Sequence, residues 1–209
     1  MRDTQSPRRR PPTFERIAGN LCLDFVNTLD NRPSAQPKEL LNHYVDLVRF
    51  CEEAGALTLS EANALIEESP FQPDTARRVL ENAIELREAL HAVFTAIIEK
   101  RKVPTDAMVL VNVRIQDAAT DARLRPVNGK FEWDLSFPPT LSRALRPIAH
   151  SAADLLTSDD LQYLRACSSA TCQWLFLDTS KNHRRRWCDM KSCGNRAKVR
   201  RFYARKKNA

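Results

Sequence analysis

Glycine is scarce in this chain. The 209 residues contain four glycines, at positions 19, 55, 129 and 194. A dinucleotide-binding GxGxxG fingerprint and a Walker phosphate loop both need closely spaced glycines, so neither can be written here. This scarcity argues against the familiar nucleotide-dependent enzymes.

Long apolar runs are missing too. No stretch reaches the roughly 18 residues that a membrane span needs. Residues 1–13, MRDTQSPRRRPPT, are basic and lead into no apolar segment, unlike a secretory signal. Their composition predicts a disordered basic leader, with a phosphate-binding arm as the alternative. We therefore expect a cytoplasmic protein with no membrane partner.

Acidic residues are almost absent from the C-terminal end. From Asp178 to Ala209, twelve Lys and Arg residues accompany only two acids, so this segment carries a charge of +10. Residues 1–177 hold the other 21 bases and 24 acids, a net charge of −3. Such a local positive field indicates an anionic partner, with nucleic acid first and an anionic membrane surface second.

Apolar residues recur at helical spacing through most of the chain before residue 160. Asn128-Gly129, between RLRPV and KFEWDLSF, favours a type I′ β-hairpin. We therefore expect a mainly α, multihelical body over residues 14–160 with one small β-hairpin. A short helix opened by Ser158 should lead from this body to Cys167. The pattern predicts longer helices over 36–54, 61–69 (capped by Ser60), 74–100, 105–122 and 140–156 (interrupted at Pro147).

The segment from Phe14 to Leu29, FERIAGNLCLDFVNTL, fits either a buried strand or the start of a helix. Three polar residues, Asn20, Asp24 and Asn27, interrupt its apolar run. One interpretation is that they cap or tie down the local backbone. The other is that they line a small-molecule pocket together with His43.

Four of the six cysteines lie within 27 residues. Their spacing is Cys167-x4-Cys172, fifteen residues, then Cys188-x4-Cys193, the sequence form of a structural zinc site. Free or disulfide-paired cysteines and an iron–sulfur cluster are the alternatives. Four thiolates saturate one Zn²⁺ and leave no open position for water, which favours a structural role over catalysis. Because no convergent acid–base set accompanies them, we expect no enzyme.

The residues around these cysteines suit a small metal module. Trp174, Phe176 and Trp187 can cover the site, and the polar residues 178–182 can form a turn between two short strands. A helix follows Cys193. This order of knuckle, hairpin and helix predicts a treble-clef-like zinc finger with four cysteine ligands.

Several short motifs carry a family resemblance. Cys193-Gly194-Asn195-Arg196, Arg185-Arg186-Trp187-Cys188 and Asp178-x-Ser180 resemble the CGNR zinc-finger family, here over residues 161–209. The segment GNLCLDFVNTLDNR resembles the opening of the ABATE domain that commonly precedes this finger, here over residues 14–160. The resemblance implies a bacterial, stress-induced transcription regulator.

The final helix is expected to have two different faces. At 100° per residue, Val199, Phe202 and Tyr203 form one stripe, which we expect to pack on the finger. The opposite arc is basic. The alternatives are a solvated charged face, with Arg186 and Arg196 tied to structure, and a protein or anionic-lipid contact. The candidate nucleic-acid-binding residues are Arg184, Arg185, Arg196, Lys198, Arg200, Arg201 and Arg205, which would supply phosphate affinity more than base reading.

Two functions are compatible with these patterns. The first is a DNA-binding transcription regulator whose body senses a small-molecule effector or forms a homodimer. The second is a protein-interaction or small-molecule-binding protein in which the finger is purely structural.

Overall fold

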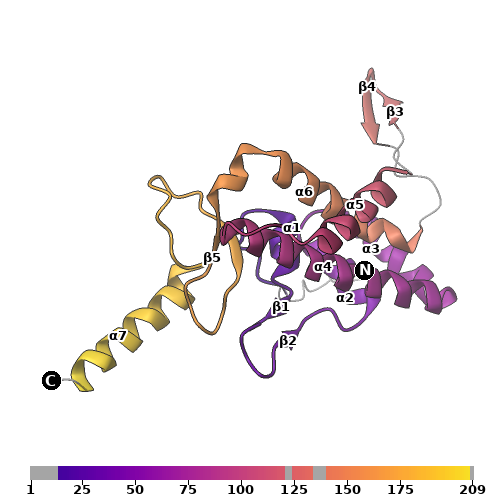
Figure 1. The fold of residues 1–209 in the computed structure, drawn as a ribbon. Coiled ribbons are helices and arrows are strands. Elements are labelled where there is room, and N and C mark those ends of the chain that lie inside the picture. Colours follow the sequence, from indigo (N-terminus) through magenta and orange to yellow (C-terminus); the bar gives the residue numbers. More distant parts are fainter. Residues whose placement is uncertain (1–13, 121–123, 134–139, 208–209) are drawn as a thin grey trace, which may run out of the picture.

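The computed structural model describes residues 14–120, 124–133 and 140–207. The fold is mainly helical, with short two-stranded sheets (Figure 1). Each of the three described sheets is antiparallel and pairs neighbouring strands, β1 with β2, β3 with β4 and β5 with β6. The helices are α1 (Leu21–Val26), α2 (Tyr44–Glu53), α3 (Leu59–Glu68), α4 (Pro73–Ile98), α5 (Thr105–Thr120), α6 (Arg146–Thr157) and α7 (Asn195–Lys207). The strands are β1 (Leu29–Asp30), β2 (Lys38–Glu39), β3 (Leu124–Val127), β4 (Lys130–Trp133), β5 (Leu164–Ala166) and β6 (Leu175–Leu177).

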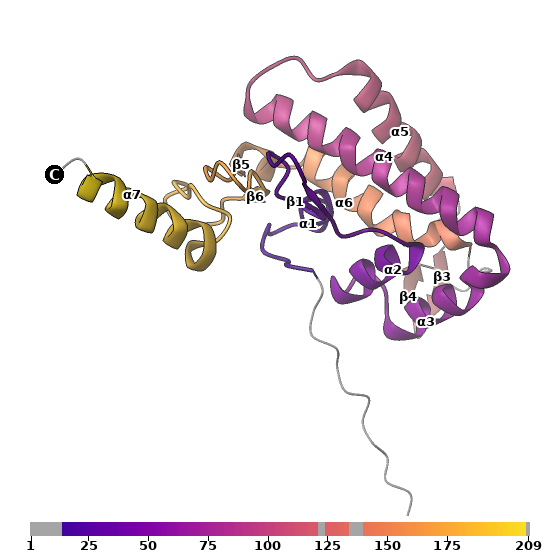
Figure 2. The same cartoon turned by 90° about the horizontal axis from the view of Figure 1, so that it is seen from below.

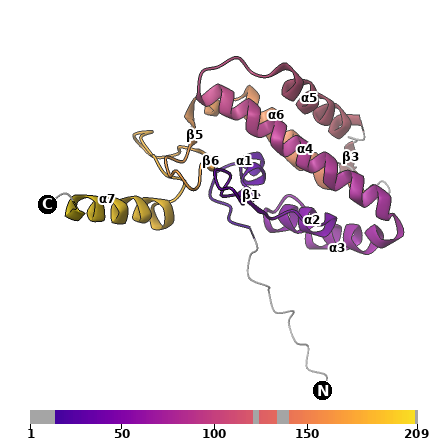
Figure 3. The same cartoon turned by 60° about the horizontal axis from the view of Figure 1, so that its bottom comes forward.

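The long helix α4 organises the body. It packs against α5, which also contacts α6, so the three helices run side by side (Figure 3). The short helix α1 contacts both α4 and α6 and is buried through Cys22, Leu23, Phe25 and Val26. The sequence of this segment was compatible with either a strand or a helix. The structure makes it a helix whose first turn is capped by the side chain of Asn20.

Two predicted helix starts are wrong. Helix α2 begins at Tyr44, not near residue 36, because His43 is extended and the carboxylate of Asp46 accepts a hydrogen bond from its backbone N–H. Residues 38–39 form β2 instead. Helix α3 is capped by Thr58 in a capping box with Glu61, and Ser60 lies inside the helix.

Other predicted elements are confirmed or refined. The β3–β4 hairpin turns at Asn128 and Gly129, both with positive φ (50° and 76°), as a type I′ turn requires. Pro147 does not interrupt a helix. It lies in the first turn of α6, after a 3₁₀ segment over Leu141–Leu145, where a missing N–H is harmless. The predicted short helix after Ser158 is a 3₁₀ turn over Asp159–Tyr163 that leads into β5.

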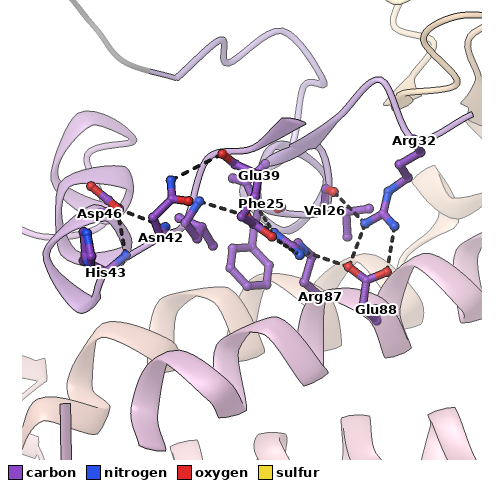
Figure 4. A network of polar contacts seen from close by, with 11 residues as sticks. Phe25, Val26, Arg32, Glu39, Asn42, His43, Asp46, Arg87 and Glu88 are labelled. Atoms are coloured by element: carbon purple, nitrogen blue, oxygen red, sulfur yellow. Dashed lines mark hydrogen bonds and ion pairs between the residues drawn. The ribbon is translucent and has the colours of Figure 1, made fainter. Parts of the chain in front are cut away.

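A buried charge network ties the β1–β2 segment to α4 (Figure 4). The guanidinium of Arg87, only 2% exposed, donates to both carboxylate oxygens of Glu39 at 2.6 and 2.7 Å. Its Nε donates to Glu88, which also accepts from Arg32. Positive and negative charges thus alternate along the network. The carboxylates of Glu39 and Glu88 pair with the guanidinium of Arg87, which would be costly to bury without them.

One apolar core runs through the body and into the cysteine segment. Strand β6 is buried at all three residues and contacts α1. Phe176 of β6 belongs to the same core as Phe25 of α1 and Leu90 of α4. Residues 164–177 are therefore part of the folded body, while α7 extends away from it (Figure 2). No helix in the described ranges is long and apolar enough to cross a membrane.

Candidate metal centre and basic helix

The first cysteine pair lies on the connection between β5 and β6. Cys167 directly follows β5, and its backbone N–H donates to the carbonyl of Trp174 at 2.8 Å. Cys172 closes the turn by donating its own N–H to the carbonyl of Ser169. The hairpin therefore brings both thiols to one end of the β5–β6 ladder.

The second cysteine pair lies just before α7. Cys188 ends a loop, and Cys193 is in a π-helical turn over Met190–Gly194. Asp189 caps this turn, because its side chain accepts from the N–H of Ser192 and its carbonyl accepts from the N–H of Gly194. The turn delivers Cys193 at the start of the last helix.

The four cysteine sulfurs form one compact cluster. All four residues are buried, and the Sγ atoms lie within 4.8 Å of one another. The Sγ atoms of Cys172 and Cys188 are 3.6 Å apart, and those of Cys188 and Cys193 are 3.7 Å apart. A tetrahedral zinc ion with Zn–S bonds of about 2.3 Å places its sulfurs about 3.8 Å apart. The residues present thus fit a single Zn²⁺.

The thiols of the cluster shift one another's pKa values. Hydrogen bonds from the thiols of Cys172 and Cys188 lower the pKa of Cys167, since they stabilise its thiolate. Those same hydrogen bonds, with the thiolate beside them, raise the pKa of Cys172 and Cys188. Without a cation, these interactions therefore favour the thiolate form at Cys167 over Cys172 and Cys188. A divalent metal removes this restriction by binding all four as thiolates.

The residues of the CGNR motif each have a structural task. Gly194 packs against Met190, whose sulfur would lie 2.9 Å from an added Cβ. The amide of Asn195 donates to the carbonyl of Lys191 at 2.9 Å. Arg196 donates from Nη2 to the sulfur of Cys193 at 3.0 Å, which is the type of outer contact that orients a metal ligand.

The sequence placed Asp178 in a family motif and in a polar turn, but the structural role of its carboxylate was missed. The side chain is fully buried and accepts from the N–H and hydroxyl of Ser180 and from the N–H of Arg185. Its carbonyl contacts Nδ1 of His183, whose ring stacks on Tyr163 at 3.9 Å. Burial raises the pKa of Asp178, but these hydrogen bonds outweigh it and hold the pKa below its usual value.

The predicted strand pairing around residues 178–182 is wrong. The described residues 178–187 contain no strand, and β6 pairs instead with β5, which precedes the first cysteine pair. The loop is organised by Asp178 instead. Of the residues predicted to cover the site, Trp174 and Phe176 are buried and Trp187 is half-buried.

Helix α7 projects away from the rest of the molecule (Figures 1 and 2), and its main contact is with the Met190–Gly194 turn that precedes it. The prediction that Val199, Phe202 and Tyr203 pack on the finger is wrong. Their exposed fractions are 53%, 63% and 65%. The apolar stripe exists, but the finger ends before it can cover the stripe.

The predicted nucleic-acid-binding residues fall into two groups. Lys198, Arg200 and Arg201 on α7 are exposed, as is Arg184 in the preceding loop, and Arg205 lies in the last part of α7. The side chains of Arg185 and Arg196 are engaged in structure. Arg185 lies 4.6 Å above the ring of Phe176 and donates to the carbonyl of Trp187, whereas Arg196 binds Cys193.

The polar groups of three of the predicted small-molecule pocket residues form local or strand contacts. The carboxylate of Asp24 accepts from the N–H of Ala18, and the amide of Asn27 binds the backbone of β6. Asn20 caps α1, and His43 lies at the exposed start of α2. These are the local backbone ties that the first interpretation of the polar residues predicted.

A hollow of about 520 Å³ lies beside the cysteine cluster. Its lining combines the body and the finger. Glu15 and Asp30 come from the body, and Lys191, Arg196 and Val199 come from the finger and α7.

The fold and the site define a helical domain that shares its core with a four-cysteine finger and carries a projecting basic helix. The chain belongs to the ABATE family, described as "putative stress-induced transcription regulator", whose model matches residues 19–159. The model of the CGNR zinc finger matches residues 163–206. No curated protein matches the chain.

Proposed function

We propose that this protein is a DNA-binding transcription regulator of the bacterial cytoplasm, in which one Zn²⁺ held by Cys167, Cys172, Cys188 and Cys193 has a purely structural role. The ion would supply cross-links between the β5–β6 connection and the start of α7. The family assignment supports regulation of transcription. The proposal of DNA binding depends on one observation, the exposure of the basic helix α7.

Helix α7 is suited to a phosphate backbone. Its thirteen residues include seven bases and no acid. Lys198, Arg200 and Arg201 are exposed, and arginine forks donate two parallel hydrogen bonds to phosphate oxygens. Arg184, in the loop before Cys188, is also exposed. Such contacts give affinity and orientation, and base reading would need further groups.

Salt dependence tests this proposal. For duplex DNA, the logarithm of affinity falls with the logarithm of salt concentration with a slope of about −0.9 per neutralised phosphate. Five or six contacts therefore predict a slope of roughly −4 to −6 for the full-length, zinc-loaded protein. Fluorescence anisotropy with a labelled duplex measures it. An affinity that stays flat between low and moderate salt would contradict the proposal.

A pair of variants locates the contact. Arg200→Ala/Arg201→Ala should make the slope shallower by about 1.8, since two phosphate contacts are lost. Arg77→Ala/Arg78→Ala removes two equally exposed charges from α4 and should leave the slope unchanged. Selection from random DNA with the wild type and the first variant then asks whether one sequence is enriched. Equal effects of the two variants would place the DNA contact elsewhere.

A homodimer and a small-molecule effector remain predictions beside this function. Sedimentation at several concentrations measures the first. The hollow beside the cysteine cluster is a better candidate for the second than Asn20, Asp24, Asn27 and His43, since it adjoins both the body and α7.

A further inference from the structure

The apolar stripe of α7 has no partner within the described structure. Val199, Phe202 and Tyr203 lie within an arc of about 100° and are each more than half exposed. Two exposed aromatic rings on a helix that projects from the rest of the protein (Figure 2) form an apolar surface of the kind that marks an interaction site.

The charges around the stripe restrict what can cover it. Lys198 and Lys206 lie one helical turn before and after Phe202, and both are exposed. A second α7 would bring seven more positive charges alongside the first seven, so a helix pair through this stripe is disfavoured. Charge complementarity calls for a polyanion that also offers apolar, flat surfaces.

Nucleic acid with unpaired bases has both properties. In a duplex the faces of the bases are covered by their neighbours, whereas unpaired bases can stack on aromatic side chains. Phe202 and Tyr203 meet edge to face, with ring centroids 5.6 Å apart, so their mutual contact leaves a face of each ring uncovered. Basic grooves with exposed aromatic rings are how proteins hold single strands.

We propose that α7 binds DNA whose bases are unpaired, with Phe202 and Tyr203 stacking on bases while Lys198, Arg200 and Arg201 hold the phosphates. This inference rests on the proposed DNA-binding function and narrows its ligand. The stripe and the basic arc are then two halves of one contact. The bases lie on the apolar stripe, with Lys198 and Arg200 at its two edges and Arg201 reaching the backbone from the opposite arc.

A DNA strand that lacks bases tests whether stacking contributes to binding. Anisotropy with the full-length, zinc-loaded protein compares a 20-nucleotide DNA strand, the same strand built with abasic positions, the matched duplex and the matched RNA strand. Stacking of two bases at about 1–3 kcal/mol each predicts that the abasic strand binds at least tenfold more weakly than the normal strand. Equal affinity for the normal and abasic strands would overturn the inference, because phosphates alone would then explain binding.

Two variants separate the halves of the contact. Phe202→Ala/Tyr203→Ala removes the rings without changing the charge, so it should lose at least tenfold in affinity for the normal strand and keep its salt slope. It should change affinity for the abasic strand by less than about twofold. Arg200→Ala/Arg201→Ala should instead make the single-strand slope shallower by about 1.4. Phe202→Trp/Tyr203→Phe retains both rings and should bind like the wild type. Circular dichroism and zinc content check that every variant is folded.

The possible failures are distinguishable. If the wild-type protein bound none of the DNA ligands, the proposed function itself would be overturned. Salt-dependent duplex binding that Phe202→Ala/Tyr203→Ala leaves unchanged, with no preference for the normal over the abasic strand, would overturn only the stacking inference. Tighter, ring-dependent binding to the RNA strand would overturn the assignment to DNA. Conversion of a dimer to a monomer by the aromatic variant, without any base dependence, would assign the stripe to self-association instead.

Discussion

The side-chain amide of Asn27 forms with Leu175 the two hydrogen bonds that a neighbouring β-strand would form. Its Oδ1 accepts from the backbone N–H at 3.0 Å, and its Nδ2 donates to the carbonyl at 2.9 Å. Both residues are buried. A residue directly after α1 thus completes the free edge of β6, and the ABATE body and the finger share a hydrogen-bonded seam as well as a core.

Replacement of Asn27 should loosen this seam. Asn27→Ala leaves a buried N–H and a buried carbonyl of Leu175 without partners, and each unsatisfied group costs about 1–3 kcal/mol. We expect the free energy of unfolding to fall by about 2–4 kcal/mol, measured by urea denaturation. Asn63→Ala, on the exposed side of α3, is the matched control and should change it by less than about 0.5 kcal/mol. Equal effects would mean that the seam adds no stability.

The ion pair between Glu39 and Arg87 should also be sensitive to substitution. Glu39→Gln keeps the shape but leaves the buried guanidinium without one of its two carboxylates. Breaking a fully buried pair costs about 3–5 kcal/mol, and the partial exposure of Glu39 reduces this to about 2 kcal/mol. Glu81→Gln, in the exposed pair with Arg77 on α4, should cost less than about 0.5 kcal/mol.

The same pair predicts a response to acid. Burial raises the pKa of Glu39, but the hydrogen bonds and charge of Arg87 outweigh it, so the pKa lies below its usual value. The stabilisation is therefore present above the unfolded pKa of about 4.3 and is lost as the pH falls through the folded value. Glu39→Gln should weaken this acid dependence, and an unchanged profile would contradict the assignment.

Asp24 should have the opposite effect to Glu39 on how stability changes with pH. Burial raises its pKa to about 6, because the hydrogen bond from the N–H of Ala18 only partly offsets desolvation. The folded state then binds a proton more tightly than the unfolded state, so this residue lowers stability as the pH rises from about 4 to 6. Asp24→Asn keeps the acceptor and removes the charge. It should raise the free energy of unfolding by about 2 kcal/mol at pH 7.5 and by about half as much at pH 5.

Urea denaturation in zinc-containing buffer measures this difference. Asp154→Asn, on the exposed side of α6, is the control and should behave alike at both pH values. A gain from Asp24→Asn that grows towards acid would show that the sign is wrong.

Periodicity and spacing predicted the parts of this structure that depend on nearby residues. The stripe of α4, the Asn128-Gly129 turn and the grouping of four cysteines all follow from local pattern. The partner of Asn27 could not be predicted, because Leu175 lies 148 residues away and an amide carries no sign of its acceptor. The burial of Arg87 could not be predicted either. An isolated charged residue in a helix is expected to be exposed, and its partner Glu39 is 48 residues away in the sequence.

The stripe of α7 shows a different limit. Helical spacing correctly grouped Val199, Phe202 and Tyr203 on one face, but a face does not specify what covers it. The prediction placed the finger against this face. Strand β6 is buried against the body while α7 projects beyond the finger, so the stripe is exposed.

Removal of the metal should affect more than the finger. Zinc binding contributes about 10–16 kcal/mol in isolated finger peptides. Here β6 also packs in the body core, so a disordered cysteine cluster should loosen β6 as well. We expect Cys193→Ser to lower zinc content well below one per chain and Tm by roughly 5–10 °C, a loss of about 2–3 kcal/mol from the body.

The control is another buried cysteine. Cys51 donates its thiol to the carbonyl of Ala144, and burial raises its pKa to about 12, so it stays protonated. Cys51→Ser can keep that hydrogen bond and should retain one zinc per chain. Metal analysis, calorimetry and circular dichroism of both variants separate the outcomes. If Cys193→Ser lost zinc and left Tm unchanged, the finger would fold independently of the body, and the shared core through β6 would carry no coupling between them.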